Sequence, residues 1–67
     1  MMRVEINGEA QEFDREMTVS ELLQALEFTG RRIAVERNGM IVPRSEHEAT
    51  RVEDGDRVEI VQAVGGG

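Results

Sequence analysis

The sequence predicts an α+β fold in one small domain, with a single amphipathic helix packed against a mixed β-sheet. Three observations predict it. The chain has 67 residues, which leaves room for one hydrophobic core. Short stretches of alternating apolar and polar residues are bounded by turn dipeptides, as is typical of strands. One further stretch repeats its apolar residues at helical spacing.

The N-terminal segment is predicted to form a β-hairpin. Apolar and polar residues alternate over residues 2–6, which is the period of a half-buried strand. Asn7-Gly8 is a preferred centre of a type I′ turn, because both positions of that turn adopt positive φ. Residues 9–13 are therefore expected to pair back as a second strand.

A helix is predicted to begin at a capping box over residues 18–21, in which Thr18 and Glu21 satisfy each other's backbone amides. Gly30 is its predicted C-terminal stop. The helix is too short to be stable alone in water, so the sheet must cover its apolar stripe. That stripe has the spacing i, i+3, i+4, i+7 and consists of Val19, Leu22, Leu23 and Leu26.

The chain after the helix predicts a third strand and a short return. Residues 33–37 alternate, and Asn38-Gly39 predicts a turn into residues 40–42. Pro43 ends this segment, and because proline donates no ladder hydrogen bond, residues 40–42 are interpreted as an edge strand. Residues 44–50 are expected to form a loop or a single helical turn.

The last strand is predicted at residues 57–62, after the turn Asp54-Gly55-Asp56. Its open face should change from charged to apolar as it approaches the C-terminus, and Val61 and Ala63 form a possible docking strip. Scattered exposed apolar residues are also normal on protein surfaces, so both interpretations stand. The predicted core consists of Val4, Ile6, Leu22, Leu26, Ile33, Val35, Val58 and Ile60.

Composition excludes several classes of function. The absence of cysteine excludes a disulfide framework, a thiolate zinc site and a catalytic thiol. The one histidine, His47, is interpreted as a solvated loop residue, so no catalytic residue or metal site is expected. A net charge of -6 argues against a nucleic-acid partner. No apolar run approaches the roughly 20 residues of a membrane span, and no signal segment is visible. We expect a cytoplasmic protein that contacts no membrane.

The sequence ends in Gly65-Gly66-Gly67, which divides the chain into a body at residues 1–64 and a flexible tail at residues 65–67. A glycine tail has no side chains to pack, and it fits a narrow channel in a partner. A C-terminal carboxylate, with a reference pKa of about 3.3 to 3.7, is ionised and must be activated before it reacts. The chain has neither a phosphate-binding loop with lysine nor a catalytic dyad, so ATP chemistry would belong to a partner. A glycine-rich end can also be a frayed terminus.

A family resemblance rests on three segments: Val35–Gly39 continued by Ile41–Ser45, then Asp54–Val61, then Ala63–Gly67. With them, nearly the whole chain is similar to the ThiS family of bacterial sulfur carrier proteins. Asp-Gly-Asp with a terminal Gly-Gly also fits MoaD, the small subunit of molybdopterin synthase. MoaD-like chains are usually longer and carry prolines before the terminal glycines. Pro43 is the only proline here, which favours ThiS.

The resemblance implies a ubiquitin-like β-grasp fold and a role as a protein co-substrate rather than an enzyme. It implies that Gly67 is adenylated by an E1-like adenylyltransferase, ThiF, which uses ATP, and is then converted to a thiocarboxylate (1-thioglycine). The sulfur would come indirectly from a cysteine desulfurase. Thiazole synthase, ThiG, would accept it while building the thiazole ring of thiamine. Gly65 and Gly66 would occupy the partner's channel, and the chain itself would bind no cofactor.

Other functions use the same features. A MoaD-like carrier would deliver sulfur to molybdopterin. A ubiquitin-like modifier would form isopeptide bonds with protein lysines from the same adenylate and tail. A β-grasp interaction module would leave the glycines inert and use the surface around Val61.

Overall fold

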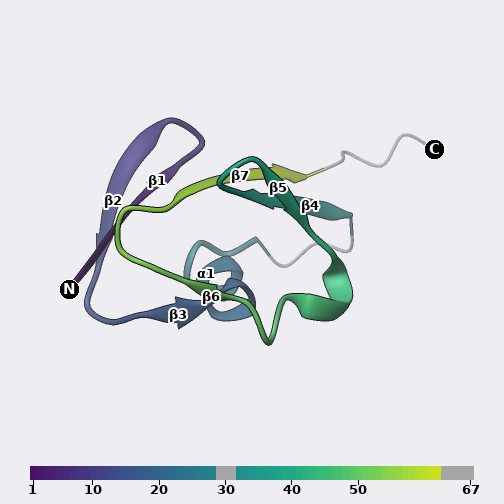
Figure 1. Ribbon diagram of the computed structural model, residues 1–67, viewed down its shortest axis with the longest axis horizontal. Helices are drawn as coiled ribbons and strands as arrows, with labels where there is room; N and C mark the ends of the chain where they lie inside the picture. The colour runs from purple at the N-terminus through teal and green to yellow at the C-terminus, as the bar shows by residue number, and fades with distance from the viewer. Residues whose placement is uncertain (29–31, 63–67) are drawn as a thin grey trace.

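The computed structural model describes residues 1–28 and 32–62. A five-stranded mixed sheet has the order β2-β1-β7-β4-β5, and one helix covers one of its faces (Figure 1). The C-terminal strand β7 is central: it runs parallel to β1 and antiparallel to β4. The strands are β1 (Met2–Ile6), β2 (Glu9–Phe13), β4 (Ile33–Arg37), β5 (Met40–Val42) and β7 (Arg57–Gln62). The architecture confirms the predicted α+β class.

Two Asn-Gly turns build the hairpins of this sheet, as predicted. Asn7 and Gly8 have φ of 50° and 87°, and Asn38 and Gly39 have φ of 53° and 84°. These positive values are those that a type I′ turn requires, and asparagine and glycine adopt them readily. β1 therefore pairs antiparallel with β2, and β4 pairs antiparallel with β5, which lies at the sheet edge as expected.

The helix α1 (Val19–Ala25) begins where the sequence predicts. The Glu21 amide donates to Thr18 Oγ1 at 3.1 Å, and the Thr18 amide donates to Glu21 Oε1 at 2.9 Å. This reciprocal pair confirms the capping box. The same hydrogen bonding, chiefly the one from the Thr18 backbone, lowers the pKa of Glu21.

The helix ends earlier than predicted. Glu27 adopts a left-handed conformation, with φ of 63°, directly after the C-cap. Its amide donates to the Gln24 carbonyl, and the Phe28 amide donates to the Leu23 carbonyl at 2.8 Å. These two bonds form a Schellman motif, in which glutamate takes the position usually held by glycine. The stop predicted at Gly30 is therefore wrong, and Gly30 itself lies outside the described residues.

A two-stranded antiparallel sheet, formed by β3 (Met17–Thr18) and β6 (Arg51–Val52), was missed in the sequence. Two-residue strands are too short to show a period. The predicted helical turn within residues 44–50 is the 3-10 helix η1 (Arg44–Glu46).

The core lies between the five-stranded sheet and α1. Most of the predicted core is buried, namely Val4, Ile6, Leu22, Val35, Val58 and Ile60. Leu26 and Ile33 are only half-buried and pack against the core from its edge. Val19 and Leu23 of the predicted helix stripe are also buried, and the further buried residues Met2, Val42 and Val52 were not among the predicted core residues. Within the described part of the chain, no helix is long and apolar enough to cross a membrane.

Candidate functional site

The open face of the sheet, opposite α1, carries the predicted docking strip on β7. Val58 and Ile60 are buried against the helix, whereas Arg57, Glu59 and Val61 alternate with them and are exposed. Val61 is 63% exposed, which is unusual for a large apolar side chain on a central strand. The alternation confirms where Val61 was predicted to lie. Its predicted role remains a hypothesis.

The rest of the predicted site lies outside the described residues. This holds for Ala63 of the docking strip and for the tail residues Gly65, Gly66 and Gly67. The last described residue before them is Gln62, at the end of β7.

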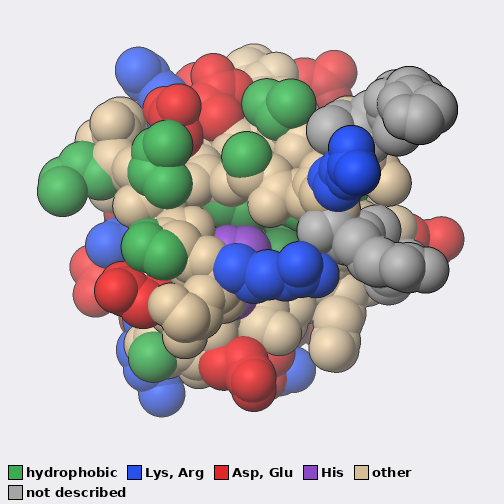
Figure 2. Space-filling model, turned by 90° about the vertical axis from the view of Figure 1, so that its right-hand side faces the viewer, with side chains coloured by type: hydrophobic (Ala, Val, Ile, Leu, Met, Phe, Trp, Pro, Cys, Tyr) green, Lys and Arg blue, Asp and Glu red, His purple; other side chains and the backbone are tan. Residues whose placement is uncertain are grey.

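Neighbouring strands add apolar groups to the open face that were not predicted from the sequence. Ala34 of β4 is the register partner of Val61, and it is exposed. Ile41 of β5 is 69% exposed. It is the register partner of Glu36, which lies two residues after Ala34 on β4. Several hydrophobic side chains reach the surface when the molecule is viewed from the end toward which β7 runs (Figure 2). Combining the strand alternation with the Asn38-Gly39 turn register would have found Ile41.

Acidic side chains border this apolar patch. Glu36 and Glu59 are direct cross-strand partners, and both are exposed. Like charges placed opposite each other destabilise a sheet. Neither carboxylate forms an ion pair with any described residue, so the repulsion is uncompensated there. The open face therefore combines an apolar patch with negative charge, which suits a partner surface of opposite charge.

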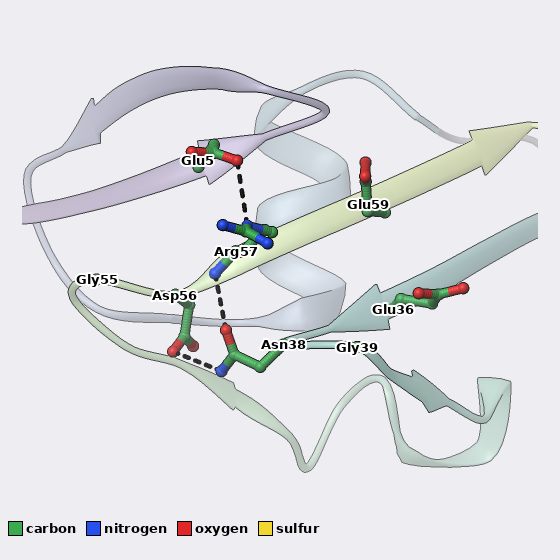
Figure 3. Close-up of a pocket in the computed structure, with 8 residues that line it drawn as sticks. All are labelled: Glu5, Glu36, Asn38, Gly39, Gly55, Asp56, Arg57 and Glu59. Atoms are coloured by element: carbon green, nitrogen blue, oxygen red, sulfur yellow. Dashed lines mark hydrogen bonds and ion pairs between the residues drawn. The ribbon is translucent and has the colours of Figure 1, made fainter.

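A hollow of about 530 Å³ lies beside these carboxylates at the start of β7 (Figure 3). Arg57 Nε is 3.3 Å from Glu5 Oε2 across one side of it. The described residues contain no group of three His, Cys, Asp or Glu side chains placed to bind a metal ion. The hollow is lined by Glu5, Glu36, Asn38, Gly39, Gly55, Asp56, Arg57 and Glu59.

Asp56 is the one buried charged residue among the described residues, with 8% of its surface exposed. Arg37 Nε donates to its Oδ2 at 2.6 Å, Asn38 Nδ2 donates to its Oδ1 at 3.0 Å, and the Glu53 amide donates to Oδ2 at 2.8 Å. Burial by itself raises the pKa of Asp56. The hydrogen bonds from Arg37, the Glu53 backbone and Asn38 outweigh burial and hold the pKa below its usual value.

Two asparagine side chains fix β7 to both of its neighbours. The Asn38 side-chain Oδ1 accepts from the backbone amide of Arg57 at 2.9 Å, and the backbone amide of Asn38 donates to the Arg57 carbonyl at 2.8 Å. Asn7 bonds both backbone groups of Ile60: its Oδ1 accepts at 2.7 Å and its Nδ2 donates at 3.1 Å. The sequence alone predicts these asparagines only as turn residues. They also make β7 a fixed base for the chain that follows it.

His47 is less exposed than the solvated loop residue that was predicted. It is half-buried, and its Nε2 lies 3.1 Å from the Val42 carbonyl oxygen. This contact joins the end of η1 to β5. The geometry gives His47 a structural role, because it packs against the backbone of its own fold.

Comparisons with known proteins agree with this geometry. The model of the ThiS family matches residues 4–67. The crystal structure of the thiamine biosynthesis protein ThiS from Geobacter metallireducens superimposes with a TM-score of 0.85 and 38% sequence identity. The match covers 98% of this chain and 100% of that one. The ubiquitin-like β-grasp fold of ThiS is therefore the fold of this chain.

Two further relatives differ in length. A thiazole synthase from Paramagnetospirillum magneticum is 48% identical over 98% of this chain, but the match covers only 20% of that protein. An uncharacterized protein, ycf40, from Porphyra purpurea is 38% identical, and the match covers 96% of this chain and 90% of that one. The chain thus spans a small part of the thiazole synthase and most of the algal protein.

Replacing Asp56 with asparagine is expected to lower the free energy of unfolding at pH 7 by about 2 kcal/mol, because charged hydrogen bonds are lost. Since its folded pKa is lowered, Asp56 stabilises the fold fully above its unfolded pKa of about 3.9. That contribution disappears as pH falls through the lower folded pKa. The difference between Asp56→Asn and wild type should therefore shrink on acidification.

The difference in free energy of unfolding is measured by urea unfolding, followed by circular dichroism because the chain has neither Trp nor Tyr for fluorescence. Glu59→Gln is the matched control: it removes one carboxylate three residues further along the chain, on β7, and that carboxylate is exposed and forms no ion pair with any described residue. It should cause no loss of stability. Equal effects of the two variants would contradict the role given to Asp56.

Proposed function

Because the chain belongs to the ThiS family, we propose that it is a sulfur carrier in thiamine synthesis and that Gly67 carries the sulfur. The observation that carries this proposal is the extent of the family match, which runs through the terminal glycines to Gly67. The structural match to a thiamine biosynthesis protein, which covers 98% of this chain, supports it.

The proposed chemistry occurs at the terminal carboxylate. An E1-like adenylyltransferase, ThiF, binds ATP, and a carboxylate oxygen of Gly67 attacks the α-phosphorus and releases pyrophosphate. A sulfur nucleophile, supplied indirectly by a cysteine desulfurase, then attacks the acyl carbon. The carbon–sulfur bond forms as AMP leaves. A persulfide nucleophile gives an acyl disulfide, and a partner thiol then attacks the sulfur bound to the partner, which breaks the S–S bond, releases the thiocarboxylate and leaves a disulfide on the partner. The carrier contributes the reacting carboxylate and holds no cofactor. It is therefore a protein co-substrate.

Thiazole synthase, ThiG, is the proposed acceptor of the sulfur. The support is that a segment 48% identical to this chain forms part of a longer protein named thiazole synthase. Gly65 and Gly66 would lie in the channel of each partner, since glycine permits the closest approach of a backbone to a ligand. The Asn7 side chain bonds both backbone groups of Ile60, which fixes the end of β7 to the β1–β2 turn.

Deleting Gly67 is expected to abolish sulfur transfer and leave the melting temperature unchanged, because the tail has no side chains to pack in the core. The loss of sulfur transfer is measured as thiazole formation in a mixture with the adenylyltransferase, the desulfurase and thiazole synthase. Continued sulfur transfer from the shortened chain would contradict the role of Gly67. High-molecular-weight adducts formed through Gly67 of the wild type would instead indicate a protein modifier.

Val61→Asp tests the proposed docking strip. Burying a valine in an interface contributes about 1.5 to 3 kcal/mol, so partner affinity should fall by about tenfold or more while the fold persists. Ala10→Asp is the matched control. It adds the same charge to the same open face, but on the edge strand β2, which β1 separates from β7. An affinity equal to that of Ala10→Asp would remove Val61 from the docking surface.

A further inference from the structure

The last residues of β7 have less strand pairing than its first residues. Within the described part of the chain, β1 pairs with β7 at Arg57 and Val58, and this register stops there. On the other side, β4 pairs with β7 as far as Gln62, but it does so with its own first residues, Ile33 and Ala34. The end of β7 therefore depends on a further contact on the β1 side.

The Asn7 side chain supplies that contact. A side-chain amide carries an acceptor oxygen and a donor nitrogen, so it can pair with a strand residue as a peptide group does. Asn7 Oδ1 accepts from the Ile60 amide at 2.7 Å, and Asn7 Nδ2 donates to the Ile60 carbonyl at 3.1 Å. The backbone amide of Asn7 also donates to the Val58 carbonyl at 2.9 Å. Asn7 thus extends the ladder by one step, from a turn that lies beside β7 (Figure 1).

Asn38 provides an internal comparison. It occupies the same position of the other Asn-Gly turn, with φ of 53° against 50° for Asn7. Its side chain bonds the Arg57 amide at 2.9 Å and Asp56 Oδ1 at 3.0 Å, at the start of β7 and directly before it. The two asparagines therefore hold opposite ends of one strand. A role in stability applies to both, whereas a role at the C-terminal end of β7 applies only to Asn7.

We propose that Asn7 is a positioning residue for the reaction at Gly67, because it keeps the end of β7 ordered before a partner binds. The inference rests on the proposed function, in which an adenylyltransferase activates Gly67. Each residue that frays from a strand end regains backbone freedom, and binding must then remove that freedom again. Asn7 acts through Ile60 and removes this freedom in advance. It therefore strengthens binding of the enzyme without touching the reacting atoms.

Asn7→Gly tests the proposal, and Asn38→Gly is its matched control. Glycine adopts the positive φ of both turns, so each variant removes one side chain and keeps its hairpin. The KM and kcat of the adenylyltransferase for each full-length carrier are measured by pyrophosphate release. The temperature is kept below the melting temperature of both variants.

We expect Asn7→Gly to raise KM about tenfold, which is about 1.4 kcal/mol of binding free energy, and to leave kcat unchanged. Asn38→Gly should leave KM unchanged. It should lower the melting temperature at least as much as Asn7→Gly does, because it also takes a partner from the buried Asp56 carboxylate. Equal KM values for the two variants, or an effect of Asn7→Gly on kcat alone, would overturn the proposal.

Asn7→Asp takes the place of the glycine variant if that variant does not fold. Aspartate also adopts a positive φ, keeps an acceptor for the Ile60 amide and loses only the donor to the Ile60 carbonyl. It should raise KM about threefold, which is half of a tenfold effect on a logarithmic scale. A KM equal to that of the wild type would overturn the proposal.

Amide hydrogen exchange of the free carrier tests the order of the strand end without any enzyme. Val61 and Glu59 are register partners of Ala34 and Glu36 on β4, so their exchange does not report the bonds of Asn7 to Ile60 directly. The Val61 amide should exchange about tenfold faster in Asn7→Gly than in the wild type, and the Glu59 amide should change less. Equal acceleration of both amides, or none, would overturn the proposal.

Failure of this proposal can be distinguished from failure of the proposed function. If Asn7 does not position the strand end, the enzyme still adenylates the wild type, and the two glycine variants have the same KM. If Gly67 is not activated, the wild type is not adenylated and the proposal falls with the function, although the Val61 amide still responds to Asn7→Gly.

Discussion

The central position of β7 in the sheet is the constraint on which the rest of the structure depends. It places Val58 and Ile60 in the core and Val61 on the open face. Because β1 runs parallel to β7, the two strands begin at the same end of the sheet, and β7 finishes at the opposite end (Figure 1). Asn7 and the network around Asp56 fix this strand with half-buried hydrogen bonds.

This arrangement divides the work between the chain and its proposed partners. The described residues supply a rigid base, an apolar patch and an acidic border, and the chain has no cysteine or lysine that could act as a nucleophile. Activation, sulfur supply and ring formation would all require partner enzymes. The small size of the domain accounts for this, because one thin core leaves little room for an enclosed active site.

Features that depend on neighbouring residues could be predicted from the sequence. The Asn-Gly turns and the Thr18 capping box needed only local chemistry, and the exposure of Val61 followed from strand alternation. The buried state of Asp56 could not be predicted, because it depends on Arg37, which is distant in the sequence. The second role of Asn7 likewise needs β7 beside it. The early helix end was missed because Glu27 adopts a conformation that usually indicates glycine.

In the proposed function, the carboxylate of Gly67 is the reactive group of this chain. Intact-mass analysis tests it most directly, on protein isolated with its partner enzymes from cells that must synthesise thiamine. We predict a mass increase equal to replacing one oxygen with sulfur, located at Gly67 by fragmentation. A chain that stays unmodified under those conditions, or that carries sulfur at any other residue, would contradict it.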